Sequence, residues 1–95
     1  MHLAAGFGST KTVKILLEAG ADISALDENE RTPLHYAAHN RVDVVKMLLD
    51  NGADVSAVDR QQQTALDLAE DRKKIDVLKL LIEVMTYRYS LAVLQ

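Results

Sequence analysis

The chain contains KILLEAGADISALD at residues 14–27 and KMLLDNGADVSAVD at residues 46–59, which align without a gap at an offset of 32 residues. A second pair of segments, TPLHYAA at residues 32–38 and TALDLAE at residues 64–70, repeats at the same offset. Two kinds of segment alternating at one period indicate a repeat protein, in which one small structural unit is stacked several times.

Each unit of the repeat predicts two short helices. Thr32 is a residue type that caps a helix, and Pro33 follows at the first helical position, where its missing N–H is not needed. A second helix is predicted over about residues 42–51, because its apolar residues form one broad face. Gly20 and Gly52 directly follow the second helices, at the position where a left-handed residue closes a helix.

The segments after these glycines, ADISALDENE and ADVSAVDRQQQ, are polar and rich in turn-forming residues, so each predicts a projecting hairpin. TPLHYAA, LLEAGAD and LLDNGAD resemble the signature segments of the ankyrin repeat family. The resemblance implies an all-α solenoid of stacked helix-turn-helix units with hairpin loops. One unit cannot bury its apolar face alone, whereas stacked units can.

The resemblance divides the chain into an ankyrin repeat domain at residues 1–84 and a C-terminal helical extension or tail at residues 85–95. The domain consists of three units, at about residues 1–26, 27–58 and 59–84. The first unit lacks its Thr-Pro start and the hairpin that would precede it. Two interpretations remain open: the chain is a fragment of a longer array, or the array starts abruptly.

Several positions depart from the family pattern. Gly8 stands where the family has a glycine between the two helices. In the second unit Asn40 is expected to take this left-handed role, because Asn tolerates positive φ. In the third unit Lys73 falls there, at a cost of about 1 kcal/mol if the conformation is kept. Asp67 replaces the signature histidine, as in the ending units of such arrays, while Thr64 repeats the helix cap.

The tail has two candidate conformations. Its alternation in TYRYSL suits a strand. Alternatively, the last helix continues and covers the exposed end of the stack, because apolar residues recur at helical spacing, namely Ile82, Met85, Tyr89 and Ala92 or Val93. A contact with a partner or with a second copy of the chain is the other use of this apolar surface.

Bulk composition excludes several functional classes. The formal net charge is −3 and argues against nucleic-acid binding through phosphate contacts. The chain has no cysteine, so thiolate metal sites and disulfides are excluded, and the expected location is intracellular, in the cytoplasm. No apolar run approaches the roughly 20 residues of a membrane span, and the N-terminus lacks a signal-peptide pattern.

His35 and His39 lie four residues apart, which is the spacing at which two helical imidazoles can bind zinc. A zinc site of the HExxH type needs a glutamate after the first histidine, and Tyr36 stands there instead. The ankyrin resemblance implies that His35 braces the first helix against neighbouring backbone and a threonine. No P-loop or dinucleotide fingerprint occurs, so we expect neither an enzyme nor a cofactor or metal.

The resemblance implies a non-catalytic scaffold that holds a protein partner on a concave face of hairpin tips and first helices. Arg31, Tyr36 and Arg60 lead the candidates, because Tyr and Arg most often carry interface energy. Tyr36 and its equivalent, Leu68, are expected to be partly exposed there. The predicted partner-binding residues are Phe7, Glu28, Asn29, Arg31, Tyr36, His39, Asn40, Arg60, Gln61, Gln63, Asp71 and Arg72.

A second function is also consistent with the sequence. The chain could serve as a structural segment of a longer array, or as a repeat fragment that forms homo-oligomers through its exposed ends or residues 85–95. A molecular mass in solution that rises with protein concentration would indicate this second function. A stable monomer that binds a protein partner would indicate the scaffold.

Overall fold

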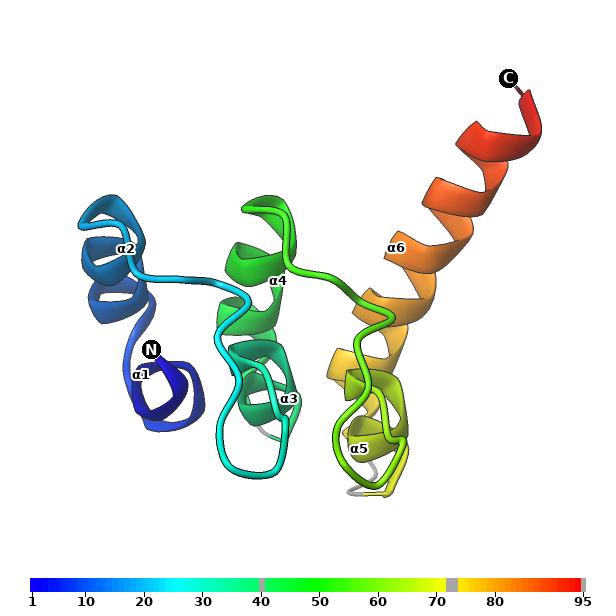
Figure 1. Ribbon diagram of the computed structural model, residues 1–95. Coiled ribbons are helices and arrows are strands. Elements are labelled where there is room, and N and C mark those ends of the chain that lie inside the picture. Colours follow the sequence, from blue (N-terminus) through cyan, green and yellow to red (C-terminus); the bar gives the residue numbers. More distant parts are fainter. Residues whose placement is uncertain (40, 72–73, 95) are drawn as a thin grey trace.

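A computed structural model of the chain describes residues 1–39, 41–71 and 74–94, with only the backbone described at 71 and 88–94. Figure 1 shows successive helix pairs stacked side by side, with α1, α3 and α5 in one row and α2, α4 and α6 in the other. The described residues contain no strand, which agrees with the predicted all-α fold. The helices are α1 (His2–Phe7), α2 (Thr10–Glu18), α3 (Pro33–Ala37), α4 (Val42–Asp50), α5 (Ala65–Asp71) and α6 (Ile75–Leu94).

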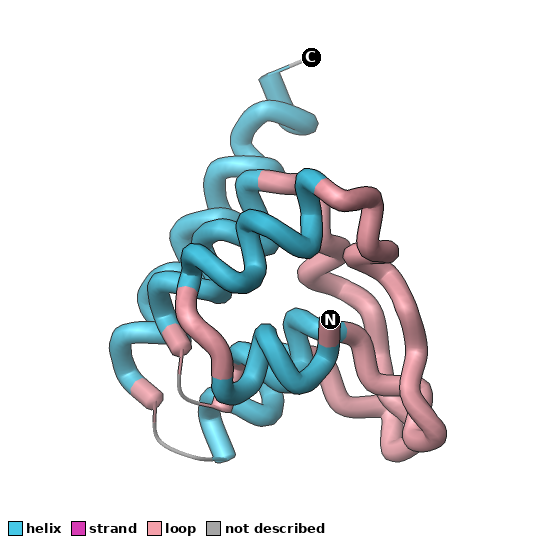
Figure 2. The backbone as a smooth tube through the Cα atoms, turned by 90° about the vertical axis from the view of Figure 1, so that its left-hand side faces the viewer, coloured by secondary structure: helices cyan, strands magenta, loops and turns pink. Residues whose placement is uncertain are grey.

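The predicted hairpins are long loops that join one helix pair to the next. They connect α2 to α3 and α4 to α5 and contain turns but no strand pairing. Figure 2 shows both loops on the same side of the helices. The loops are therefore stacked on each other, as the helix pairs are.

The starts of α3 and α2 carry side-chain caps, and the cap at Thr32 was predicted from the sequence. The hydroxyl oxygen of Thr32 accepts a hydrogen bond from the backbone N–H of His35 at 3.3 Å, and Pro33 occupies the first turn. In α2 the Ser9 hydroxyl oxygen accepts from the N–H of Thr12 at 3.2 Å. These contacts satisfy N–H groups that have no partner inside the helix.

The helix ends follow the prediction at two glycines. Gly20 has a φ of +89° and Gly52 a φ of +92°, so both adopt the left-handed conformation expected after a second helix. The end of α4 at Asp50 lies one residue from the predicted end.

Gly8 plays a different part from the one expected for it. Its φ is −82°, so the glycine between α1 and α2 is not left-handed. A Cβ atom on Gly8 would lie 2.7 Å from the carbonyl oxygen of Ala4, so a glycine is needed here because the backbone approaches closely. The expectations for Asn40 and Lys73 lie outside the described residues.

Small residues in the first helices and branched residues in the second helices make up the core. Fully buried alanines let neighbouring first helices approach closely, and these are Ala5, Ala37, Ala38 and Ala69. The second helices supply larger side chains with almost no exposure, namely Val13, Val44, Val45, Leu48, Val77 and Leu81. None of the helices that the structure describes is both long and apolar enough to cross a membrane.

The tail is helical as far as Leu94, where α6 ends, so the strand alternative is wrong. The expectation that this extension covers the end of the stack is also wrong for the side chains described. Ile82 remains 53% exposed and Met85 41% exposed, and α6 extends beyond the ends of α2 and α4 (Figure 1). The side chains of Tyr89, Ala92 and Val93 lie outside the description.

The two glycines of the first unit, Gly6 and Gly8, should respond in opposite ways to the same substitution. A Cβ atom on Gly6 would meet the Tyr36 ring at 3.5 Å, an ordinary contact, so Gly6→Ala should raise the free energy of unfolding by about 1 kcal/mol. Gly8→Ala should lower it by about 2 kcal/mol, because the added carbon collides with backbone. Urea unfolding of both variants checks this, and equal effects would contradict it.

Candidate functional site

Each long loop contains a tip that closes on an aspartate, the first tip at residues 27–31 and the second at residues 59–63. The Oδ1 atom of Asp59 accepts hydrogen bonds from the N–H groups of Gln61 and Gln63, both at 2.9 Å. The N–H of Asp59 donates to the carbonyl of Gln63 at 2.9 Å, which completes a closed turn. An aspartate binding its own following backbone is a common way to fix a turn.

The first tip repeats the same bonds. The Oδ1 atom of Asp27 accepts from the N–H groups of Asn29 and Arg31, both at 2.8 Å. The N–H of Asp27 donates to the carbonyl of Arg31 at 3.1 Å. The two tips therefore have one conformation despite their different sequences.

Both tips hold a non-glycine residue in the left-handed conformation. Glu30 has a φ of +59° and Gln62 a φ of +63°. This conformation costs about 1 kcal/mol for a side chain with a Cβ atom. The hydrogen bonds to the two aspartates offset that cost, so the tips are held in one geometry.

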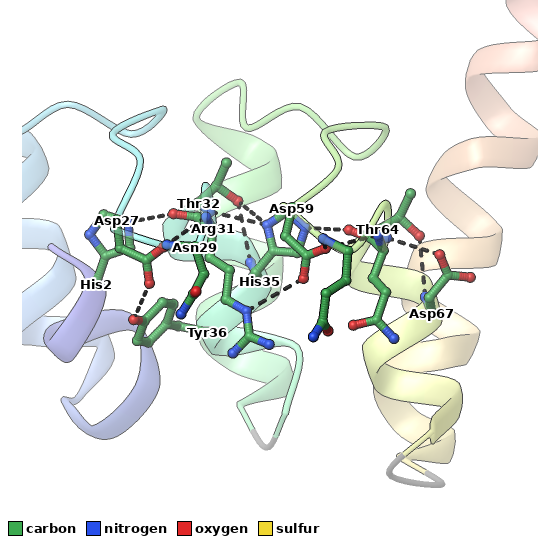
Figure 3. Close-up of polar contacts among 12 residues, drawn as sticks. His2, Asp27, Asn29, Arg31, Thr32, His35, Tyr36, Asp59, Thr64 and Asp67 are labelled. Carbon is green, nitrogen blue, oxygen red and sulfur yellow. Dashed lines mark hydrogen bonds and ion pairs between the residues drawn. The ribbon is translucent and has the colours of Figure 1, made fainter.

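Two contacts tie the first tip to the second. The N–H of Arg60 donates to the carbonyl of Asn29 at 2.8 Å. The Nε atom of Arg31 lies 3.4 Å from Oδ2 of Asp59, and Figure 3 shows this ion pair spanning the two units. Because Asp59 is only 1% exposed, its charge is paired where water does not reach it.

Two histidines join the tips to the first helices. The Nε2 atom of His2 donates to the carbonyl of Arg31, and Nε2 of His35 donates to the carbonyl of Gln63, both at 2.8 Å. The Nδ1 atom of His35 accepts from the N–H of Thr32 at 3.1 Å, which places the ring proton on Nε2. Both ring nitrogens of His35 are therefore engaged within the protein, which supports its structural interpretation.

No group of three or more His, Asp or Glu side chains within the described part of the chain is placed to hold a metal ion. His39 is half-buried in the turn after α3.

The third unit ends this series of contacts. The N–H of Thr64 donates to Oδ2 of Asp67 at 2.9 Å, and the N–H of Asp67 donates to the Thr64 hydroxyl oxygen at 3.2 Å. Asp67 thus reproduces the helix cap that Thr32 and His35 form in the second unit. In the second unit Nε2 of His35 also donates to the carbonyl of Gln63 in the next loop. The ionised carboxylate of Asp67 has no proton to donate in this way.

Tyr36 lies between the first unit and the first tip. Its hydroxyl donates to Oδ2 of Asp27, and its ring meets the His2 ring edge to face, with the ring centres 5.1 Å apart. These contacts leave the Tyr36 side chain half-buried. The equivalent residue, Leu68, is only 4% exposed, so its expected exposure on this side was wrong.

The hydrogen bonds of the tips change the acidity of three groups. Burial by itself raises the pKa of Asp59, but the N–H groups of Gln63 and Gln61 outweigh it and hold this pKa below its ordinary 3.8. The pKa of Asp27 is lowered in the same way, because the Tyr36 hydroxyl and backbone N–H groups outweigh its burial. The hydrogen bond to Asp27 raises the pKa of Tyr36 above 10.0.

The structure divides the predicted partner-binding residues into three sets. The side chains of Phe7, Glu28, Asn29, Arg60 and Gln61 are exposed. Those of Arg31, Tyr36, His39 and Gln63 are half-buried, and Arg31 and Tyr36 are engaged in contacts within the protein. Asn40, Arg72 and the side chain of Asp71 lie outside the description.

Sequence reasoning missed the residues that shape the tips. Neither Asp27 and Asp59 nor the left-handed Glu30 and Gln62 were singled out. The recurrence of Asp27 and Asp59 at an offset of 32 residues was the signal available for the aspartates. Nothing in the residue types of Glu30 and Gln62 indicates positive φ.

Comparison with known proteins gives one family. The family described as ankyrin repeats, in three copies, matches residues 1–89. Rabankyrin-5 of Mus musculus is 48% identical over 44 residues, which are 46% of this chain and 4% of that protein. Protein phosphatase 1 regulatory subunit 12A of Mus musculus is 46% identical over 39 residues, which are 41% of this chain and 4% of that protein.

A third relative is the ARF GTPase-activating protein Git of Drosophila melanogaster. It is 48% identical over 40 residues, which are 42% of this chain and 6% of that protein. The chain therefore matches only a small part of the length of each of these relatives.

Replacing the buried carboxylate tests the electrostatics of the tips. Asp59→Asn should lower the free energy of unfolding by about 2 kcal/mol at neutral pH, because an ionised acceptor is lost. The folded-state pKa lies below the unfolded one, so this stabilisation is present above about pH 4 and is lost as the pH falls through the folded-state value. The difference between the two proteins should therefore shrink in acid.

Denaturant unfolding between neutral pH and acid measures this difference. The exposed Asp50 at the end of α4 provides the control, and Asp50→Asn should change stability little at any pH. If the difference in the free energy of unfolding between Asp59→Asn and the parent chain stayed constant with pH, the stabilising role assigned to the ionised Asp59 carboxylate would be contradicted.

Proposed function

We propose that this chain, which belongs to the ankyrin repeat family, is a non-catalytic scaffold that binds a protein partner through its loop tips and first helices. Ankyrin repeats generally mediate protein–protein interactions, and the relatives carry them as regions of longer proteins. The partner would contact the concave face that these elements form.

One observation carries this proposal: exposed polar side chains stand on a backbone that buried contacts hold in place. Glu28, Asn29, Arg60 and Gln61 are exposed at the tips. Their backbone is fixed by Asp27 and Asp59 through the bonds described above. A surface held in its binding conformation loses less entropy when a partner associates, which favours affinity.

The charges of the tips favour a polar protein partner. The first tip exposes Glu28 and Glu30, whereas the second exposes Arg60. Opposite charges on adjacent tips give specificity to a protein with a matching pattern, and they do not suit a uniformly anionic nucleic acid or lipid surface. On the first helices, Phe7, which is 81% exposed at the end of α1, is the proposed aromatic anchor.

The contacts of the polar side chains also favour a role without catalysis. His35, Asp27 and Asp59 are the chemically versatile groups of the tips, and each is held by backbone N–H or carbonyl groups. An intracellular, cytoplasmic location, proposed from the lack of cysteine, fits this role.

A second candidate function, that of a segment within a longer array, is favoured by exposed apolar residues of the first unit. Leu3 and Ile15 are 72% and 56% exposed. HLAA at residues 2–5 aligns with HYAA at residues 35–38, so Tyr36 is the equivalent of Leu3, and Met47 is that of Ile15. Both equivalents are half-buried, and Tyr36 packs against the first unit. A further unit stacked on this face would bury Leu3 and Ile15 in the same way.

The scaffold proposal is tested by capture of a partner from cell lysate with a charge-neutral double substitution. Glu28→Ala with Arg60→Ala removes two exposed tip side chains and leaves the engaged Arg31 in place. We expect a captured protein to bind this variant at least about tenfold more weakly, which corresponds to about 1.4 kcal/mol.

The control is Glu18→Ala with Lys46→Ala, which removes the same charges from exposed positions on α2 and α4. It should retain the captured protein at the original affinity. Equal retention by both variants would count against the tips as the binding surface.

A further inference from the structure

The guanidinium of Arg31 has one engaged edge and one open edge. Its Nε atom is buried and lies 3.4 Å from Oδ2 of Asp59, which is 1% exposed. Its two Nη atoms make no hydrogen bond or ion pair with the part of the chain that the structure describes. Figure 3 shows these outer nitrogens pointing away from Asp59, and the side chain is 30% exposed. Most of the N–H donors of Arg31 are therefore open to a ligand.

The pairing with Asp59 holds this guanidinium in one orientation. Asp59 is itself fixed, because its Oδ1 atom accepts from the N–H groups of Gln61 and Gln63. A free arginine side chain loses much rotamer entropy when it binds a ligand. Arg31 has already lost part of that entropy on folding, so its open edge can bind at a smaller cost.

The junction of the two tips carries a net positive charge. Arg31 comes from the first tip and Arg60 from the second, and the N–H of Arg60 donates to the carbonyl of Asn29 at 2.8 Å. Two arginines beside the single carboxylate of Asp59 leave one positive charge unbalanced. An anionic group of a partner is attracted to such a junction.

A carboxylate suits this junction better than a phosphate. The open edge of an arginine can form two parallel hydrogen bonds to the oxygens of a carboxylate. A carboxylate also balances the single positive charge, whereas a phosphate group carries about 1.5 to 2 negative charges near neutral pH. Glu28 and Glu30, which are exposed on the first tip, would oppose the additional charge.

The other residues at equivalent or neighbouring positions lack this arrangement. Gln63 is the equivalent of Arg31 at the offset of 32 residues and carries no charge. Arg60 is exposed and makes no ion pair within the described ranges of the chain, so nothing there fixes its guanidinium. The oriented guanidinium is therefore that of Arg31, between the first tip and the second.

We propose that the open edge of Arg31 binds an aspartate or glutamate side chain of the protein partner. This inference rests on the proposed function and names the acidic group that a partner places between the tips. Arg31 then has two roles, because its Nε atom joins the first tip to the second and its Nη atoms bind the partner.

Peptides selected from a random displayed library against the full chain provide the test. Peptides whose binding is weakened by Glu28→Ala with Arg60→Ala depend on the tips, and these are retained. We expect them to share an aspartate or a glutamate. Replacing that residue with its amide should weaken binding to the parent chain about tenfold, because the bonds to Arg31 lose their ionised acceptor.

Arg31→Lys shows whether Arg31 is the group that binds the carboxylate. Lysine keeps a positive charge for Asp59 but has one ammonium and lacks the planar fork. The acidic peptide and its amide should therefore bind this variant with nearly equal affinity, whereas a purely structural effect would weaken both by the same factor. Arg41→Lys is the matched control and should keep the difference, since Nε of Arg41 lies 3.9 Å from Oδ1 of Asp43, away from the tips.

Two results would overturn the carboxylate contact and leave the proposed function standing. One is a set of tip-dependent peptides without a shared acidic residue, and the other is a difference between acid and amide that survives Arg31→Lys. If no selected peptide depended on the tips, the proposed function would fail and this inference with it.

Discussion

The Asp59 carboxylate is the group on which the arrangement of the loops depends. It is almost completely buried, and its two oxygens meet the N–H groups of Gln61 and Gln63 and the guanidinium of Arg31. A buried charge is tolerated only when such partners surround it. Because one oxygen closes the second tip and the other binds the first, a single side chain fixes the shape of one loop and its position against its neighbour.

The histidines carry this constraint from the loops to the helices. His35 caps α3 through Nδ1 and holds the carbonyl of Gln63 through Nε2, so one ring connects a first helix to the following loop. His2 makes the equivalent bond to Arg31. Asp67 forms the equivalent cap at the start of α5 but has no second ring nitrogen to donate to a loop. This series of helix-to-loop contacts therefore stops at the third unit. The backbone of the tips is thus held in place while their outer side chains remain exposed.

Local interactions made much of the fold predictable, and contacts between units decided the rest. The cap at Thr32 and the left-handed glycines follow from residues adjacent in sequence. The roles of Arg31 and Tyr36 were harder to predict, because residue type alone made them leading candidates for binding a partner. Whether they are free depends on Asp59 and Asp27, which the fold brings to them. The exposure of Leu68 and Ile82 similarly depends on whether a neighbouring helix covers them.

Native-state amide hydrogen exchange tests most directly whether the tips are rigid. The N–H groups of Asn29, Gln61 and Gln63 all donate to the two aspartates, although they lie in loops with exposed side chains. If the buried network holds the tips, these amides should open with nearly the same free energy as the N–H of Leu48 in the core helix α4. Exchange of the tip amides at rates typical of a mobile loop, with the Leu48 amide still protected, would contradict the account.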